Sequence, residues 1–562
     1  MRRSIFLMTF TILALTVSCT EDFSEINEKP NALTAEDVSA KYFLTNLQQQ
    51  LFAPNRYPYW RGPIIHADRY AGHTTFGFSA CWWNDGLGYV YSPSYTDVVH
   101  DFWMSGFNSL QTGYMNFVQE GGVLENTKYE AIGLIMKGLY YQYFTDIFGM
   151  VPFSEASNPD ITTPKYDTQK DIYKGIIDDL DQAISMIGGE TSTGSGADAL
   201  TDNDLFFGGD LQSWKQLANS LKLRLGLRAN GAAGDDFSAS AITEAITGGV
   251  LATRDATIKR DLEISTWVSA VYGDVWGPFY GGGHWNLSKT LIDALRDNND
   301  PRLTRYARPS DGGTIKWTRP TEGDNVALFE KHTSFLTELL DNSGATYTIN
   351  TTADGLQVDM PAGVNYVGQP TRLNGKIKPY LDTNLFSKPA EIVVNQHNSG
   401  KPIFPFIVMT AAESHFMIAE AIVKGLASGD AQSYYQEGLR HAMRLWEVPD
   451  GEIESFISSE SMALLNGSSE ENLEKIATQR WMALFTNGFE AWSIVRDSGY
   501  PNELASGVND LDIYELGDLN GDYPQRMRYG NGAYNTNGQR LNEANAIQGP
   551  DKQATRLWWA KN

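Results

Sequence analysis

The chain has 562 residues, of which 42% are hydrophobic and 20% are charged, and this composition is typical of a globular protein. Its formal net charge of −24 at pH 7 disfavours nucleic acid and anionic membrane surfaces as partners. With only two cysteines, the chain has no disulfide framework, so the fold must be stabilised by its core. Aromatic residues reach 12%, and we expect some of them to face a ligand.

The N-terminus predicts a secretory signal peptide over residues 1–18. Two arginines precede an apolar run over residues 5–17, which is about 13 residues long and therefore shorter than the roughly 20 that a membrane-spanning helix needs. Ser18 stands immediately before Cys19, as in a lipoprotein cleavage site. We expect Cys19 to become the mature N-terminus and to carry an N-terminal lipid, with residues 19–33 as an extended tether. The alternative is an ordinary signal peptide followed by an accidental cysteine.

Helices are predicted in the N-terminal part after the tether. The first begins at Thr34, which can form a cap with Asp37, and continues to about residue 51. A second begins at Thr127 and is predicted from apolar residues at spacings of three and four up to Ile147. Two more are predicted over about residues 167–187 and 211–228.

The C-terminal part predicts helical hairpins. Thr410 and Glu413 form a cap for one helix, and a partner begins near Asp430 after a glycine turn. A further pair is predicted over about residues 470–487 and 490–496. Several such hairpins resemble a tetratricopeptide-type scaffold, although the full repeat consensus is absent.

Between about residues 300 and 405 the chain becomes rich in Gly, Pro, Asn and Thr, with short apolar runs such as residues 392–394. This texture predicts loops with a few strands, and the tail after Pro501 has the same character. The predicted fold class is therefore mainly α: a tetratricopeptide-like scaffold of helical hairpins with a loop-rich half and a few short strands.

A set of motifs spans nearly the whole chain. Residues 140–156 read YYQYFTDIFGMVPFSEA, and further motifs follow in a fixed order at 166–169, 209–215, 218–224, 300–303, 413–421, 478–481, 488–492, 496, 524–529 and 558–559. In type and order they resemble the motifs of the SusD/RagB family of outer-membrane lipoproteins. The resemblance implies one SusD-like domain over residues 34–562. Its scaffold would cover about 34–250 and 410–500, and its loop-rich, ligand-facing parts about 55–100, 260–405 and 500–562.

The resemblance also implies a function. Proteins similar to this one form the lid over a TonB-dependent outer-membrane transporter of the SusC type, capture an oligomeric nutrient that is usually a glycan, and deliver it to the barrel without catalysis. The lipid on Cys19 would then hold the protein to the outer membrane, facing the cell exterior. Glu21 and Asp22 resemble the surface-export signal of such lipoproteins. Apart from this lipid, no cofactor is implied.

Two aromatic segments are the candidate glycan site, because sugar rings stack on aromatic rings while their hydroxyls need polar side chains. The residues predicted to bind ligand in the first segment are Asp68, Trp82, Trp83, Asn84 and Asp85. Those in the second are Trp267, Trp276, Tyr280 and Trp285, which surround a run of three glycines. Arg372 could donate to sugar hydroxyls from the loop-rich half, its alternative being a solvated loop arginine. For each aromatic, packing on the scaffold is the alternative.

No metal site is predicted. Residues 518–522 imitate the start of a calcium loop, but its twelfth position is Tyr529 instead of a bidentate glutamate. Glu413 and Glu420 share a helix face, and we expect them to meet arginines. No serine-hydrolase, zinc-protease or nucleotide-binding motif occurs. The resemblance implies binding without catalysis, so the chain is not expected to be an enzyme.

Two alternatives stay open at this stage. One is a RagB-like lid that accepts oligopeptides, since charge and aromatic content do not exclude peptides. The other is a secreted glycoside hydrolase, which needs two carboxylates about 5 to 10 Å apart, and a chain with 68 acidic residues can supply such a pair.

Overall fold

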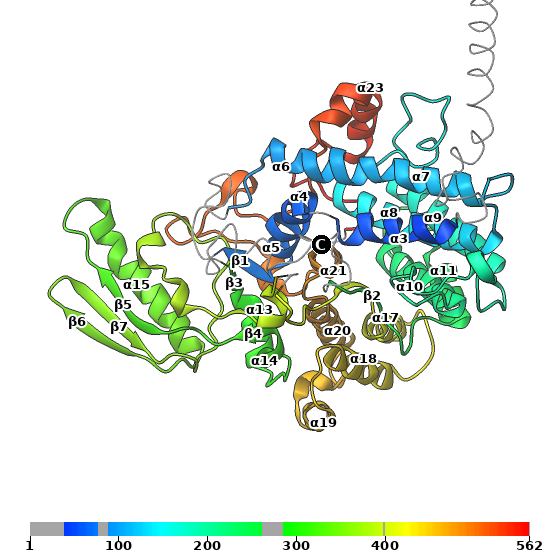
Figure 1. Ribbon diagram of the computed structural model, residues 1–562. Helices are drawn as coiled ribbons and strands as arrows, with labels where there is room; N and C mark the ends of the chain where they lie inside the picture. Colours follow the sequence, from blue (N-terminus) through cyan, green and yellow to red (C-terminus); the bar gives the residue numbers. More distant parts are fainter. Residues whose placement is uncertain (1–38, 55, 77–87, 261–284, 397–398, 561–562) are drawn as a thin grey trace, which may run out of the picture.

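The computed structural model describes residues 39–54, 56–76, 88–260, 285–396 and 399–560. Long helices occupy one side of the molecule, and short strands with their connections make up much of the other (Figure 1). This architecture confirms the predicted mainly α fold class with helical hairpins and a few short strands. No described helix is long and apolar enough to span a membrane.

The scaffold consists of consecutive helices that pair as hairpins. The pairs are α8 (Thr127–Phe148) with α9 (Gln169–Ile187), α10 (Leu211–Ala229) with α11 (Ser238–Gly248), α17 (Ala411–Val423) with α18 (Ala431–Leu445), and α20 (Ser469–Ala483) with α21 (Gly488–Ser498). Helix α10 also packs on α9 and α17, and α17 packs on α20, so neighbouring hairpins stack in chain order. The remaining scaffold helices are α3 (Ala40–Phe52), α7 (Gly106–Val118) and α19 (Asp450–Ser459).

Polar caps set where these helices begin. Thr410 accepts a hydrogen bond from the backbone N–H of Glu413, as predicted, and Thr168 and Asp210 cap α9 and α10 in the same way. Helix α8 is capped by Asn126, one residue before the predicted Thr127. A cap is a local signal, which is why these starts could be predicted to within two residues.

The first helix as described begins at Ala40, with Ser39 as its cap. The predicted start at Thr34 lies outside the described residues.

Residues 56–105 are more helical than predicted. Helices α4 (Arg56–Tyr59) and α5 (Asp68–Tyr70) flank the π-helix η1 (Trp60–Ala67), and α6 (Pro93–Asp97) leads into the π-helix η2 (Val98–Ser105). The predicted loop-rich character of about residues 55–100 is therefore wrong for these stretches. A proline usually interrupts an α-helix, so Pro63 argued against a helix here. In the structure it lies inside η1, a π-helix whose hydrogen-bond pattern differs from that of an α-helix.

The loop-rich half is built from short elements. Its two-stranded antiparallel sheets pair β1 (Thr74–Phe76) with β3 (Trp285–Leu287), β2 (Ala256–Ile258) with β9 (Phe406–Met409), and β4 (Ala307–Arg308) with β8 (Lys388–Pro389). Its short helices are α13 (Lys289–Arg296), α14 (Leu303–Tyr306), α16 (Glu391–Val394) and α22 (Asn502–Ala505), with 3-10 turns at Lys378–Tyr380, Thr383–Leu385 and Gly517–Leu519. Two more 3-10 turns, at Gly196–Asp198 and Ser461–Ala463, lie within the scaffold.

One part of this half has a core of its own. Strands β5 (Gly313–Thr318), β7 (Gly355–Met360) and β6 (Thr348–Thr352) form an antiparallel sheet in that order, covered by α15 (Asp324–Asn342). Trp317, Phe329 and Val358 are buried between the sheet and the helix. The unit extends from the body at the left of Figure 1.

Two further predictions need correction. The apolar run at residues 392–394 was expected to be a strand, but it lies in the one-turn helix α16, because three apolar residues carry no periodicity that separates strand from helix. Helix α15 and the C-terminal helix α23 (Asn531–Gln548) lie within parts predicted to be loop-rich. Polar residues fill much of α23, so it lacks a continuous apolar stripe that could predict it.

A buried network of charges holds the helical hairpins together. Arg224 binds Glu413 through two nitrogens at 3.0 and 2.6 Å, and Arg228 binds both Asp146 and Glu490. Burial alone would raise the pKa of Glu490, but Arg224 and Arg228 outweigh it, so the pKa is lowered and the carboxylate stays ionised.

The arginine partners predicted for Glu413 and Glu420 are confirmed. Arg480 binds Glu420 at 2.7 Å and lies 3.5 Å from Glu413. The residues that carry the family resemblance therefore meet in the core of the scaffold.

Candidate functional site

The two predicted aromatic segments are joined to the same end of one small sheet. Phe76, the last residue of β1, pairs with Trp285, the first residue of β3. Residues 77–87 follow Phe76 in the chain, and residues 261–284 precede Trp285. Because the strands are antiparallel, both segments are attached at the same end of this sheet (Figure 1).

Most of the predicted ligand residues fall on those two segments. Trp82, Trp83, Asn84, Asp85, Trp267, Trp276 and Tyr280 lie outside the described residues, as does Cys19. Their roles stay predictions. The structure describes the base to which the segments are attached, and it describes Asp68, Trp285 and Arg372.

The sheet that carries the segments is anchored on both sides. Asn286 donates to Gln369 at 2.6 Å and accepts from Thr383 at 3.0 Å. The backbone of Ser288 donates to the carbonyl of His73 at 3.1 Å. These buried bonds fix β3 to the loop-rich half and to the turn after α5.

His73 ties this turn to the helical scaffold. Its Nε2–H donates to the carbonyl oxygen of Trp481 in α20, 3.0 Å away. Burial lowers the pKa of His73 to about 3, although this hydrogen bond opposes the shift, so the imidazole is neutral at physiological pH.

Asp68 and Trp285 are enclosed by packing. Asp68 is 0% exposed and Trp285 is 1% exposed. Asp68 packs against Gly488 at the start of α21, where a Cβ atom would lie 2.3 Å from Oδ1 of Asp68. The two side chains thus belong to the base of the segments, and direct contact with a ligand stays a prediction for both.

Arg372 holds the C-terminal loop in place. Its guanidinium donates to the carbonyl oxygens of Leu516 at 2.7 Å, Gly521 at 2.6 Å and Asp522 at 2.9 Å. The side chain is 3% exposed, and burial lowers its pKa. It is therefore not the solvated arginine considered as the alternative, and its terminal nitrogens are occupied by protein acceptors.

The loop with the calcium-like sequence at residues 518–522 is bound by the same arginine. The guanidinium of Arg372 donates to its carbonyl oxygens at Gly521 and Asp522. Among the described residues, no group of three or more acidic, His or Cys side chains is arranged to hold a metal ion. The turn is thus organised around an arginine.

Arg372 is also in contact with the end of the first aromatic segment. Its guanidinium lies 4.8 Å from the ring centre of Tyr89, which follows residues 77–87, and Tyr89 donates to the carbonyl of Arg69 at 3.0 Å. Tyr89 has a positive φ of 62°, which is uncommon for a tyrosine. In that conformation the ring of Tyr89 packs against Arg372 and its hydroxyl reaches Arg69.

Arg260 is a candidate that sequence reasoning missed. It directly precedes residues 261–284, is 5% exposed, and donates from Nη1 to the hydroxyl of Tyr59 at 2.8 Å. Within the described ranges its Nε and Nη2 have no acceptor and no carboxylate pairs with it. A lone arginine in the sequence gives no signal for this, because burial and pairing depend on the fold.

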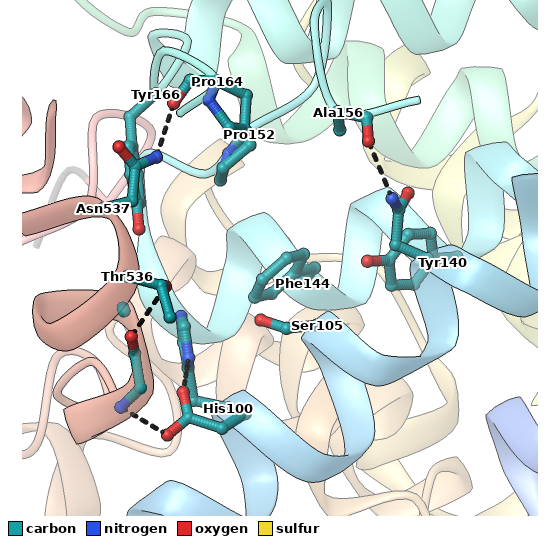
Figure 2. Close-up of a pocket in the computed structure, with 14 residues that line it drawn as sticks. His100, Ser105, Tyr140, Phe144, Pro152, Ala156, Pro164, Tyr166, Thr536 and Asn537 are labelled. Atoms are coloured by element: carbon teal, nitrogen blue, oxygen red, sulfur yellow. Dashed lines mark hydrogen bonds and ion pairs between the residues drawn. The ribbon is translucent and has the colours of Figure 1, made fainter. Parts of the chain in front are cut away.

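A separate pocket lies on the side of the scaffold near α23. It has a volume of about 330 Å³ and is bordered by η2, α7, α8, α23 and the loop at residues 152–166. Figure 2 shows His100 and Thr536 on one side, Tyr140 on the opposite side and Phe144 between them. None of the predicted ligand residues lines this pocket. Its lining comes from distant parts of the chain, so no local motif could predict it.

The comparisons with known proteins agree with the fold. A family model described as "Starch-binding associating with outer membrane" matches residues 30–318 and 333–529. No curated protein matches the chain.

Solved structures of the same architecture cover 93% of this chain. They include a chitin-binding protein (TM-score 0.71, 22% identity, 100% of that chain covered) and a Bacteroidetes AC2a SusD-like protein (0.69, 22%, 100%). A SusD homologue from Bacteroides ovatus ATCC 8483 has a TM-score of 0.68 and 20% identity, with 99% of its chain covered. At these identities the likeness concerns the fold.

Proposed function

The chain belongs to the SusD-like family described as starch-binding and associating with the outer membrane, and from this premise we propose that it captures oligosaccharides at the cell surface. In this proposal it is a lipoprotein that delivers them to a SusC-like TonB-dependent transporter, over which it acts as a lid. It binds its ligand and does not cleave it.

The observation that carries the proposal is the pairing of Phe76 with Trp285. This pairing attaches two segments that contain Trp, Tyr, Asn and Asp to the same end of one anchored sheet. A glycan site needs aromatic faces and hydroxyl partners on a rigid support, and the hydrogen bonds of Asn286 and His73 supply that support. Arg260, with donors that no described residue accepts, lies at the start of the second segment.

The N-terminal anchor is assigned membrane attachment, separate from ligand binding. We propose that Cys19 carries the lipid and that residues 19–33 tether the body to the outer membrane on its exterior face. Replacing Cys19 by Ser should release the protein from the outer-membrane fraction while oligosaccharide affinity is unchanged. A variant that stays membrane-bound would contradict the anchor, and a released variant that no longer binds would contradict the division of roles.

The site is tested by replacing Trp82 and Trp83 together with Ala. We expect calorimetry with a glycan ligand identified on an array to show affinity reduced by about thirtyfold or more, because each of the two lost aromatic faces removes about 1 kcal/mol or more. The matched control replaces Tyr42 and Phe43 on the scaffold helix α3, two neighbouring aromatic residues outside the ligand-facing parts that are 55% and 38% exposed. Equal affinity of the Trp82/Trp83 variant and the wild type would remove the first segment from the site.

Two assays on the purified wild-type protein separate the proposal from its alternatives. An oligopeptide mixture tested beside the glycan array would reveal a RagB-like peptide lid if only peptides bind. Incubation with the bound glycan, followed by an assay for new reducing ends, tests for glycoside hydrolysis, and any turnover would contradict binding without cleavage.

A further inference from the structure

The pocket beside α23 contains two buried polar atoms that lack a partner. His100 is 3% exposed and Asn537 is 9% exposed, and both line the pocket. Within the described part of the chain, no group hydrogen-bonds to Nε2 of His100 or to Oδ1 of Asn537. Unpaired polar atoms are costly when buried, so a pair of them in one pocket indicates a ligand.

The contact of His100 with its neighbour Asp101 determines which ring nitrogen donates. Its Nδ1 lies 2.6 Å from Oδ1 of Asp101. Burial raises the pKa of Asp101, but the hydrogen bond from His100 and the backbone N–H groups of Gly532 and Ala533 outweigh it, so the net shift is downward and Asp101 is ionised. A carboxylate only accepts, so Nδ1 carries a proton, and Nε2 is an acceptor when the ring holds this single proton.

The orientation of Asn537 is also fixed. Its Nδ2 donates to the carbonyl oxygen of Pro164 at 2.6 Å, which leaves Oδ1 as an acceptor. Thr536 donates its hydroxyl to the carbonyl of Gly532 at 2.8 Å, so its oxygen can accept as well. The pocket thus offers several acceptors to an incoming molecule.

The charge of the pocket, like its acceptors, favours a ligand with donors and a positive charge. Asp101 is the one lining residue with a formal charge when His100 is neutral, and no Lys or Arg is among the described residues that line the pocket. The floor is apolar, with Phe144, Pro152 and Pro164. A ligand that fits has several N–H donors and a positive charge on a small body.

The two elements that supply the unpaired atoms are irregular. His100 lies in the π-helix η2, and α23 has a kink at Asn537, whose φ of −143° and ψ of 35° are not helical. π-helical turns and local backbone irregularity are concentrated at functional sites.

We propose that this pocket binds a protonated primary amine on a small sugar-sized or amino-acid-sized molecule. The ammonium group donates to Nε2 of His100 and Oδ1 of Asn537 and is balanced by the carboxylate of Asp101. The site lies apart from the segments assigned to the oligosaccharide, so the two can be tested independently.

The test uses the full chain purified in detergent, with glucosamine and L-phenylalaninamide as amine probes and N-acetylglucosamine as the neutral counterpart. Calorimetry should show that at least one amine binds, and the better of the two identifies an amino sugar or an amino-acid source. Asp101→Asn keeps the shape and removes the charge, and should weaken that amine at least about tenfold.

A second variant keeps the test decisive if Asp101→Asn does not fold. Ser105 is exposed at the pocket and has no hydrogen bond among the described residues, so Ser105→Trp should block the pocket and abolish amine binding. Ser334→Trp, at an exposed position on α15, is the matched control and should bind as the wild type does.

Three results would overturn the proposal: neither amine binds at millimolar concentration, both amines bind the Ser105→Trp variant as well as the wild type, or N-acetylglucosamine binds with a Ser105-dependent affinity equal to that of glucosamine. N-acetylglucosamine binding that Ser105→Trp leaves unchanged belongs to the oligosaccharide site. It has no bearing on the amine pocket.

Discussion

Helix α8 contributes to two regions that use buried polar groups in opposite ways. Gln142 and Asp146 reach into the charge network, where Asp146 alone binds Arg228, Tyr173, Trp559 and Gln142. Tyr140 and Phe144, two positions earlier in each case, line the pocket of His100 and Asn537. A shift of two residues on a helix is about 200°, so these are opposite faces. On the network face the side chains of Gln142 and Asp146 have several partners each, whereas the pocket that the other face lines holds two unpaired polar atoms, on His100 and Asn537.

This difference separates structure from function better than burial does. His100 and Asn537 are almost as covered as the members of the network, so accessibility alone would treat them alike. A buried network of paired charges holds helices in register, and loss of one member leaves its partners uncompensated. Removing an unpaired group breaks no hydrogen bond of that group, and a ligand that supplies a partner gives it one.

The largest effect is expected from Glu490→Ala in the network. It leaves Arg228 and Arg224 buried without their common carboxylate and should reduce the free energy of unfolding by about 3 to 5 kcal/mol in chemical denaturation. The control is Glu454→Ala, whose surface pair with Arg440 contributes at most about 1 kcal/mol. Equal losses in the two variants would mean that the network is no more than a surface-like set of charges.

Arg372→Lys extends the comparison to the loop-rich half. Lysine cannot reach the carbonyl oxygens of Leu516, Gly521 and Asp522 in the fork geometry of arginine, so we expect a loss of about 2 to 3 kcal/mol in denaturation. Protection of residues 516–522 from amide exchange should fall with it. If Arg372 instead serves the ligand directly, glycan affinity will fall while stability and exchange stay unchanged.

His73 gives a test based on pH. Its pKa is about 3 in the fold and about 6.5 when unfolded, so below pH 6.5 the unfolded chain binds a proton that the folded chain does not. Folding stability should therefore fall as the pH decreases from 6.5 towards 3, by about 2 kcal/mol between pH 7 and pH 5 from this group alone. His73→Gln keeps a donor for the carbonyl of Trp481 and should show a shallower dependence. Identical pH profiles of the two proteins would contradict a buried neutral imidazole.

The contrast between the two faces of α8 also shows which features of the fold could be predicted from the sequence. Caps such as Thr410 and periodic apolar stripes act over a few residues, and they predicted the scaffold helices closely. The acceptor role of Glu413 could be predicted, but its partner Arg224 lies 189 positions away in the chain and only the fold identifies it. The motif at residues 140–156 predicted the family without indicating that alternate residues serve two different regions.

The candidate sites were predictable to different degrees. The aromatic composition marks the two segments, but the pairing of Phe76 with Trp285 that brings their ends together is a long-range contact. Asp68, Trp285 and Arg372 have the residue types of a glycan site and are covered in the structure, because sequence chemistry does not report burial. The pocket of His100 and Asn537 combines residues more than 400 positions apart, and its signal, two unpaired atoms, exists only in the fold.

The smallest effect on stability is expected on the pocket face, and it is the sharpest test of the comparison. His100→Phe removes an unpaired nitrogen from a ring that already packs among Phe144, Phe148 and Tyr529, at centre distances of 4.8 to 5.5 Å. Only its bond to the partly exposed Asp101 is lost, so denaturation should show a change within about 1 kcal/mol in either direction. A loss as large as that of Glu490→Ala would place His100 in the structural class with the network. A near-neutral result means that the pocket tolerates the loss of this buried polar group, as expected where the group is available to a ligand.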